Sequence, residues 1–454
     1  MKKKVGRRDF LRMGMASGLG MAIDGKSFAR KRSPELIVPP PETTVAGPIE
    51  TVKIGFVGIG HMGTGHVRNL LKIPGAQITA VCDLLPERVE KAKKLVVEAG
   101  FPEPSGYSKD KNDFRRMCAE EDLDLVYNAA PWEWHAPICL AAMENGKHAA
   151  SEVNIAMTVE DCWKLVETSE RTKKYAILME NCCYDQMEMT LLNMIRQGVF
   201  GEILHGECGY LHDLRELKLS ETYYVNMWRL KHSLEKNGCL YPTHGIGPMA
   251  WCMDINRGDA IDTLVSFSSP SIGLNEYAAK KYGSSSKYAT QKYALGDVNT
   301  TVLKTKKGKT IIVMHDTNLP RPYSRYFKVQ GSKGLARKYP EPKIYIEGRS
   351  SRPHRWEEMA AYNEEYEHPV WRKTKEMAQG AGHGGMDFIE DYRLIQALRE
   401  GVAPDIDVYD SVVWSAIIPL SIESIARGGA PMEMPDFTRG NWKKSRPLQV
   451  DLVK

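Results

Sequence analysis

The sequence predicts an α/β protein with two domains, a parallel-sheet domain followed by an α+β domain whose sheet is mostly antiparallel. Three observations support this prediction. The chain has 454 residues, which is too long for one compact core. Between residues 51 and 181, short apolar segments alternate with helical patterns, as in a parallel sheet with right-handed crossovers. From residue 182 onward, segments of strand character become frequent and several are joined by tight turns.

The N-terminus resembles a twin-arginine export signal. Arg7 and Arg8 follow a basic start, Phe10 and Leu11 come next, and a weakly apolar run ends at Ile23. This run is too short to span a bilayer. We expect residues 1–30 to be a signal peptide, residues 31–50 a linker with three consecutive prolines, and the mature protein to be periplasmic. The alternative is a basic first helix.

Composition and charge narrow the classes of partner. The formal net charge of +5 is small for this length, so we expect no nucleic-acid partner and no membrane attachment; homo-oligomerisation stays open. No spacing typical of metal ligands appears. The nine cysteines show no CxxC pair, and we expect most of them to be buried thiols. Such thiols suit the twin-arginine route, because it carries proteins that are already folded.

A glycine fingerprint predicts a dinucleotide site. The strand TVKIGFVG leads into Gly58, Gly60 and Gly63, which have the spacing G-x-G-x-x-G, and a helical pattern follows. Gly58 permits a tight turn, Gly60 lets the backbone approach a pyrophosphate, and Gly63 allows helix and strand to pack closely. The amides near Met62 and Gly63 then face the phosphate charge. An ordinary strand-to-helix turn is the alternative; the context favours a Rossmann domain over residues 51–181.

Asp83 ends the next strand, AQITAVCD, twenty residues after Gly63. This is the place and spacing of the carboxylate that binds the ribose hydroxyls of NAD. Because a carboxylate there repels a 2′-phosphate, the sequence favours NAD over NADP. The alternative is that Asp83 caps the helix that begins near Pro86.

Three more apolar strands follow, LDLVYNAAP, HAASEV and YAILMEN. A helical pattern from His135 to Asn145 ends at Gly146, and Thr158 is a candidate N-cap for the next helix. Ligands of open parallel sheets lie beyond the carboxyl ends of the strands. The polar and aromatic residues that fall there are Trp132, Glu133, Trp134, His135, Glu152 and Asn181.

The second domain is predicted over residues 182–454, beginning with a helix from Tyr184 to Gln197. Its strand segments are EILHGECGYLHD, AIDTLVSFSS, NTTVLKTKKGKTIIVMHD and SRYFKVQGSKG, and Lys307 with Gly308 is a typical tight turn. A late amphipathic helix is expected from Asp387 to Arg399, ended by Gly401.

A dinucleotide domain followed by an α+β sheet domain resembles the Gfo/Idh/MocA oxidoreductase family. That family usually has Glu-Lys-Pro at the end of its fifth strand, whereas this strand reads SEVN, with Glu152 present and the lysine absent. This departure, together with PWEWH, LYPTHGIGP, MDINRGD, TNLPRPYSR and GHGGMDF, resembles glycoside hydrolase family 109. Members of that family are NAD-dependent α-N-acetylgalactosaminidases.

The resemblance implies two sets of site residues. In addition to the fingerprint residues Gly58 and Gly60, the NAD site is implied to contain Met62, Gly63, Asp83, Trp132, Glu133, Trp134, His135, Glu152, Val153 and Asn181. The sugar site is implied to contain Tyr210, Arg229, Tyr241, Pro242, Thr243, His244 and Tyr323.

The resemblance also implies a reaction on terminal α-linked N-acetylgalactosamine without net redox change. Hydride leaves C3 of the sugar for NAD, a base removes the acidified C2 proton, the aglycone leaves, water adds, and the hydride returns. His244 and Tyr323 are then expected in proton transfer and Tyr241 in positioning the sugar. Without the resemblance, Tyr241 in a core and His244 at a helix start are the favoured interpretation. Two rival functions are a sugar dehydrogenase with net redox chemistry and an exported sugar-binding protein.

Overall fold

The computed structural model describes residues 47–453. The predicted signal peptide (1–30) and the predicted linker up to residue 46 lie outside the described residues. Residues 47–50 form neither helix nor strand, and the Ile49 N–H donates to the carbonyl oxygen of Leu398 at 3.2 Å. This end of the linker is therefore held against the second domain.

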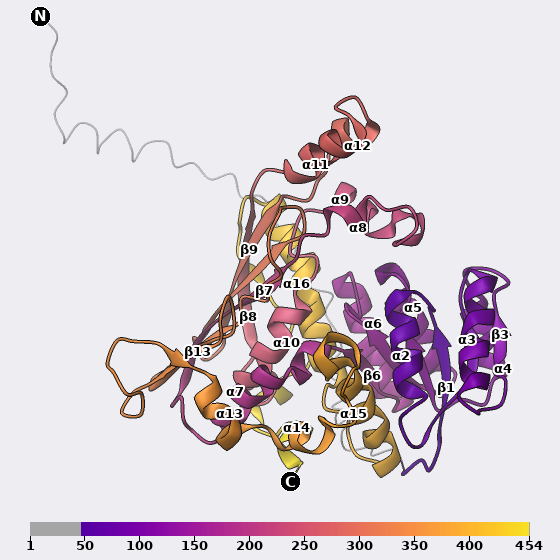
Figure 1. Ribbon diagram of the computed structural model, residues 1–454, viewed down its shortest axis with the longest axis horizontal. Helices are drawn as coiled ribbons and strands as arrows, with labels where there is room; N and C mark the ends of the chain where they lie inside the picture. Colours follow the sequence, from indigo (N-terminus) through magenta and orange to yellow (C-terminus); the bar gives the residue numbers. More distant parts are fainter. Residues whose placement is uncertain (1–46, 454) are drawn as a thin grey trace, which may run out of the picture. The chain divides into compact units, whose positions relative to one another are not determined.

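The first sheet is parallel and has the strand order β3-β2-β1-β4-β5-β6 (Figure 1). Its strands are largely buried on both faces, which explains why the sequence shows near-continuous apolar runs there. The Rossmann prediction is confirmed. The strands are β1 (Val52–Val57), β2 (Ala76–Cys82), β3 (Ser105–Tyr107), β4 (Leu125–Asn128), β5 (His148–Glu152) and β6 (Ala176–Met179).

Five helices alternate with these strands. Thr158 accepts a hydrogen bond from the Asp161 N–H, as predicted for an N-cap. The helix expected from His135 begins three residues earlier, at Trp132, because Pro131 and Glu133 suit a helix start. The helices are α2 (His61–Leu70), α3 (Pro86–Glu98), α4 (Asp113–Glu120), α5 (Trp132–Glu144) and α6 (Val159–Thr172).

The second sheet has nine strands in the order β14-β13-β12-β11-β7-β10-β9-β8-β15, and only β7 and β10 pair in parallel. The prediction of a mostly antiparallel sheet is confirmed. Gly308, with φ +86°, lies in the turn from β9 to β10. The strands are β7 (Ile203–Leu211), β8 (Ile261–Ser268), β9 (Val298–Thr305), β10 (Thr310–Asp316), β11 (Lys328–Gly331), β12 (Gly334–Arg337), β13 (Lys343–Ile346), β14 (Glu357–Glu358) and β15 (Met432–Glu433).

The remaining helices cover this sheet or connect its strands. The late helix is present as α15, which ends at Gly401 with φ +66° as predicted. The longer helices are α7 (Gln186–Arg196), α9 (Trp228–Glu235), α10 (Thr243–Cys252), α11 (Gly273–Tyr282), α13 (Ala360–Tyr366), α14 (Pro369–Thr374), α15 (Met386–Glu400) and α16 (Val408–Ala426). The short ones are η2 (Asn181–Tyr184), α8 (Arg215–Lys218), η3 (Val225–Met227), α12 (Lys287–Thr290), η4 (Gly382–Gly385), η5 (Asn441–Lys443) and η6 (Gln449–Leu452).

Helix α16 belongs to the cores of both domains. It packs against β8 of the second sheet and against α6 and β6 of the first (Figure 1). Ser411 Oγ accepts from the Leu178 N–H at 2.9 Å and Ser415 Oγ from the Ile155 N–H at 3.2 Å. Within residues 47–453 it is the one helix long and apolar enough to cross a membrane, but 78% of its 18-residue apolar stretch is buried inside the protein.

All nine cysteines are buried and free of disulfides. The expectation of buried thiols is confirmed.

Candidate active site

One cavity of about 410 Å³ is lined by residues of both domains. It opens at the carboxyl ends of the parallel strands, where the topology predicts a ligand. Gly63 is the only implied cofactor residue that does not line it. Those that do are Gly58, Gly60, Met62, Asp83, Trp132, Glu133, Trp134, His135, Glu152, Val153 and Asn181.

The fingerprint glycines divide between turn, ligand and packing roles. Gly58 has φ +87°, and a Cβ there would lie 2.6 Å from the Ala130 nitrogen. A Cβ on Gly63 would collide with the Gly58 carbonyl oxygen, so Gly63 allows α2 to pack rather than touching a ligand. At Gly60 the nearest atom to an added Cβ is an Arg88 nitrogen at 3.7 Å. The backbone is therefore open toward the cavity at the helix start, and it fits a dinucleotide pyrophosphate.

Asp83 fixes the glycine-rich loop as well as facing the cavity. Its Oδ2 accepts from the Ile59 N–H at 2.7 Å, and its Oδ1 accepts from the Leu85 N–H at 2.9 Å. The Arg88 guanidinium lies 3.7 Å from Oδ2. Leu85 is the N-cap of α3, so Asp83 does not cap that helix. The sequence predicted the ribose contact but not this backbone role.

Glu152 lies between the cavity and a buried ion network. His66 donates from Nε2 to Glu152 at 2.8 Å and from Nδ1 to Asp391 at 2.9 Å, and the Tyr127 hydroxyl donates to Asp391 at 2.8 Å. Burial alone would lower the pKa of His66, but Asp391 and Glu152 raise it well above its usual value. Burial would raise the pKa of Glu152, but His66 holds it below its usual value. An imidazolium thus keeps the cavity carboxylate ionised.

Aromatic rings surround a guanidinium at the other end of the cavity. The Arg229 guanidinium carbon lies 4.7 Å from the Tyr241 ring centre and 4.9 Å from that of Trp132. Its Nη1 donates to the Tyr224 hydroxyl at 2.9 Å. Its Nη2 is buried and has no hydrogen-bond partner among residues 47–453. A buried donor of this kind is suited to a bound hydroxyl or carbonyl.

The stretch LYPTHGIGP leads into helix α10, so His244 lies in the first turn of a helix. Pro242 is the N-cap of α10, and Pro242 and Thr243 are buried and do not line the cavity. A Cβ on Gly245 would collide with the Gly209 nitrogen of β7, and one on Gly247 would lie 2.9 Å from Glu180 Cγ. These glycines let α10 approach its neighbours rather than letting a ligand approach the backbone.

The residues expected in catalysis are close together but not equivalent. Tyr241 and His244 line the cavity, and their ring centres are 4.8 Å apart. Tyr323 does not line it. The Tyr323 ring packs 6.1 Å from Tyr210 and 5.1 Å from His212, and its hydroxyl lies 3.4 Å from Arg325 Nη1. Tyr323 is 38% exposed.

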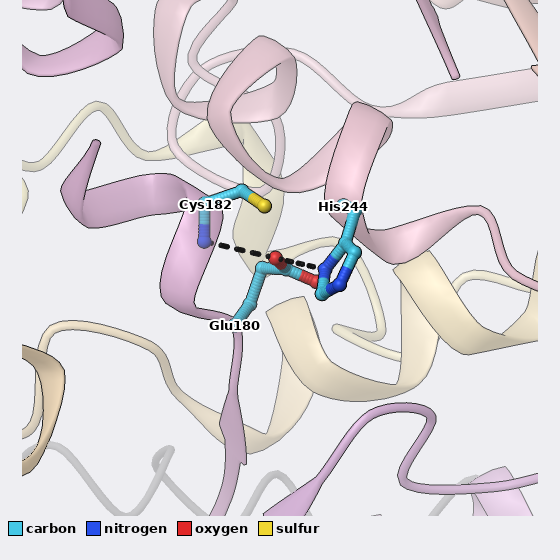
Figure 2. A group of neighbouring side chains, drawn as sticks. All are labelled: Glu180, Cys182 and His244. Atoms are coloured by element: carbon cyan, nitrogen blue, oxygen red, sulfur yellow. Dashed lines mark hydrogen bonds and ion pairs between the residues drawn. The ribbon is translucent and has the colours of Figure 1, made fainter. Parts of the chain in front are cut away.

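A buried carboxylate contacts the cavity histidine. His244 Nδ1 lies 2.7 Å from Glu180 Oε1, and the Cys182 N–H donates to the same oxygen at 3.1 Å (Figure 2). Glu180 was not among the predicted site residues.

The comparisons with known proteins agree across the chain. Residues 184–444 match the C-terminal domain of glycosyl hydrolase 109, and residues 52–180 match the NAD-binding Rossmann fold of an oxidoreductase family. A glycosyl hydrolase family 109 protein of Saccharopolyspora erythraea is 42% identical over 97% of this chain and 96% of its own. The chain belongs to glycosyl hydrolase family 109. It is therefore a glycoside hydrolase, and its cofactor is NAD.

Two further relatives are informative. A protein of Bacteroides fragilis named alpha-N-acetylgalactosaminidase is 43% identical over 89% of this family 109 chain and 97% of its own. A levoglucosan dehydrogenase solved with NADH and levoglucosan has a TM-score of 0.65 at 18% identity, covering 85% of this chain and 100% of its own. The second likeness shows that the two proteins share a fold.

Sequence reasoning missed several residues that line the family 109 cavity. His212 Nδ1 lies 2.9 Å from the Tyr210 hydroxyl oxygen, the Tyr223 ring lies 5.5 Å from that of His61, and His383 Nδ1 lies 2.8 Å from Asp387. His383 comes from GHGGMDF, one of the motifs quoted for the resemblance, and this was the available signal. The others that were missed and line it include Tyr224, Trp228, Arg88 and Lys111.

Proposed function

We propose that this glycoside hydrolase removes terminal α-linked N-acetylgalactosamine from glycans by oxidation, elimination, water addition and reduction, without net redox change. The observation that carries the proposal is a single cavity that joins a dinucleotide-binding end to an end rich in tyrosine, histidine and arginine. The named activity of the Bacteroides fragilis relative supports the choice of sugar. Ordinary glycosidases instead depend on two carboxylic acids across the scissile bond.

The cofactor would be held by the open backbone at Gly60, by Asp83 and by side chains at the carboxyl ends of β5 and β6, Glu152 and Asn181. NAD, when bound, would supply a reversible hydride acceptor for C3 of the sugar. Val153 stands where related oxidoreductases usually have a lysine and is 2% exposed, so it offers the substrate no proton. Proton transfer must then come from the other end of the cavity.

The residues at that end divide the remaining tasks. His244 would remove a proton at C2 or at the C3 hydroxyl, since an imidazole works near neutral pH. Burial raises the pKa of Tyr210 to about 12 and that of Tyr241 well above its usual value, so both phenols stay protonated and can donate to a developing enolate. Arg229 Nη2 would bind a sugar hydroxyl or the acetamide oxygen.

The test follows the two hydrogens separately. With a nitrophenyl α-N-acetylgalactosaminide in deuterium oxide, the product should acquire deuterium at C2 and keep its original hydrogen at C3. Nitrophenol should appear without stoichiometric NADH. Accumulating NADH would identify a sugar oxidoreductase, and binding without turnover would identify a sugar-binding protein. Product without deuterium at C2 would exclude elimination.

Variants assign the proton transfers. His244→Ala and Tyr323→Phe should each lower turnover by roughly 10²–10⁴-fold while NAD stays bound. His205→Ala is the matched control, because His205 bonds to Thr310 on β10 and does not line the cavity. Near-parental turnover of His244→Ala would refute its role. Tyr323 acts by proton transfer only if it reaches the sugar, so parental turnover of Tyr323→Phe would assign it to packing against Tyr210.

We also propose that the protein is exported by the twin-arginine route. The paired Arg7 and Arg8 and the nine buried free thiols support this, because a protein folded in the cytoplasm carries its thiols and its cofactor across the membrane together. Cell fractionation of the full chain against Arg7→Lys with Arg8→Lys tests it. Equal distribution of the two would refute export by this route.

Self-association is a further part of the proposal. Phe267 on β8 and Val302 on β9 lie diagonally across two paired strands of the second sheet and are 60% and 38% exposed. A contiguous apolar patch on a sheet face favours association between copies. Sedimentation equilibrium of the parent and of Phe267→Lys should show a dimer or larger species that is lost in the variant.

A further inference from the structure

We propose that Glu180 is a positioning residue that holds His244 in one tautomer, with Nδ1 protonated and Nε2 free to accept a proton in the cavity. The inference rests on the proposed function for its catalytic meaning. Its geometry stands without that function, because it concerns a contact inside the folded chain.

The contact between Glu180 and His244 is short and involves only one oxygen of the carboxylate. Glu180 is 0% exposed, and its Oε1 lies 2.7 Å from His244 Nδ1 (Figure 2). Within the described residues, His244 is the only side chain that bonds to this carboxylate, since the second contact to Oε1 is the Cys182 backbone N–H and Oε2 has no partner. An ionised carboxylate only accepts hydrogen bonds, so the proton of a neutral His244 belongs on Nδ1. Nε2 then carries the lone pair.

The fold places the two side chains with little freedom. Glu180 follows β6, and its carboxylate accepts from the Cys182 N–H at the start of η2, which fixes the direction of the side chain. His244 is in the first turn of α10, which packs across η2. The close approach needs Gly247, because a Cβ there would lie 2.9 Å from Glu180 Cγ and 3.0 Å from Cys183 Sγ. Gly247 thus leaves room for Glu180 to reach His244 from the buried side of α10.

The other charged and titratable groups near His244 do not replace Glu180. Tyr210 on β7 faces the imidazole with ring centres 5.4 Å apart, and burial keeps its phenol neutral. Tyr241, 4.8 Å away, is neutral for the same reason. Burial, with Arg229 nearby, lowers the pKa of His212. Glu180 is therefore the anion in contact with His244, and it stabilises the imidazolium that forms when His244 takes a proton.

A metal centre is the rival interpretation of the same cluster. One donor atom each from Glu180, Cys182 and His244 lies within 4.8 Å of the others. Cys182 Sγ, however, donates to Asn181 Oδ1 at 3.3 Å, and burial raises the pKa of this thiol well above its usual value. Metal binding requires a thiolate. The donor set therefore favours a carboxylate and histidine pair.

The kinetic test uses the NAD-loaded enzyme. Glu180→Gln can offer His244 either an amide oxygen or an amide N–H, so turnover should fall by about 10²-fold or more. Glu180→Asp should recover part of the loss. Incubating the parent with a chelator should leave turnover unchanged; loss of activity restored by zinc would overturn the assignment in favour of a metal.

The control is Glu207→Gln. Glu207 on β7 pairs with Lys328 and does not line the cavity, so parental activity is expected. Unchanged NAD content and unfolding temperature of Glu180→Gln would show that its loss is not a folding defect.

A readout without substrate separates this inference from the proposed function. The nitrogen-15 shifts of the His244 ring, assigned by their loss in His244→Ala, should show Nδ1 protonated in the parent and a mixed or reversed tautomer in Glu180→Gln. If the parent hydrolyses no glycoside but shows this difference, the proposed function fails and the positioning role stands. Identical tautomers in parent and variant, or parental turnover of Glu180→Gln in an active enzyme, would overturn the positioning role.

Discussion

Replacing Asp83 with alanine should weaken NAD binding and loosen the loop that binds it. Its two carboxylate oxygens accept from the Ile59 and Leu85 N–H groups, and the Arg88 guanidinium lies 3.7 Å away. The variant therefore loses a ribose acceptor and leaves two backbone donors without their partner. Two separate effects are expected, one on affinity and one on stability.

The affinity effect follows from one charged hydrogen-bonding partner, which is typically worth about 1.5–3 kcal/mol. This corresponds to a rise of roughly 10- to 150-fold in Kd. The stability effect follows from the Ile59 N–H, because Ile59 is 2% exposed. An unsatisfied buried donor costs about 1–3 kcal/mol. Asp83→Asn keeps an acceptor oxygen and loses the charge, so it should fall between the parent and Asp83→Ala in both measurements.

The assay is titration of the cofactor-free protein with NAD by calorimetry, with urea unfolding in parallel. Glu87→Ala is the matched control, since Glu87 is an exposed acid in the first turn of α3 that does not line the cavity. Both variants remove one negative charge from the same region. If Asp83→Ala titrates like Glu87→Ala, the ribose assignment is wrong, even if its stability has fallen.

Three further outcomes are expected. The purified protein should release NAD, not NADP, on denaturation without added cofactor; an active preparation with no nucleotide would contradict this. His66→Gln should lower the free energy of unfolding by about 3–5 kcal/mol, because it breaks a buried ion network. Because the pKa of His66 is raised in the folded protein, this stabilisation is complete below the ordinary histidine pKa and is lost as pH rises through the raised pKa. The free energy of unfolding measured with urea should therefore fall more at alkaline pH in the parent than in the variant. Sulfur-linked aryl glycosides should be hydrolysed, since elimination beside a ketone needs little protonation of the leaving atom; a wholly inert sulfur substrate would favour a two-carboxylate hydrolase.

The nucleotide half was predictable because its signals are local. Glycine spacing, a strand on one side and a helix on the other identify the Rossmann turn, and Asp83 follows at a fixed distance. The strands of the second sheet were also predictable from local signals, such as the tight turn at Gly308 between two segments of strand character. The start of α5 was predicted three residues too far along the chain, because aromatic residues have a weak helix preference. In the structure the helix starts directly after Pro131.

The sugar end was not predictable from pattern, because it is assembled from separate elements. Tyr210, Arg229 and His244 come from β7, α9 and α10, and only the family resemblance pointed to them together. Glu180 lies 64 positions from His244, and Asp391 lies 325 positions from His66. Periodicity shows that such residues are buried but carries no information about which of them form pairs. Gly245 and Gly247 pack against Gly209 and Glu180, which are distant in sequence, so their packing role could not be predicted from the local pattern either.

Helix α16 has a consequence for the order in which the protein is completed during synthesis. The nucleotide domain leaves the ribosome first, but β6 and α6 receive their cover from α16, which ends at Ala426. At about 5–20 residues per second, the roughly 250 residues after β6 take about 12–50 s to synthesise. During that time the edge of the first sheet near Leu178 lacks its Ser411 partner. The cofactor site can therefore be completed only when almost the whole chain has been synthesised. A chain truncated before α16 should fail to retain the nucleotide.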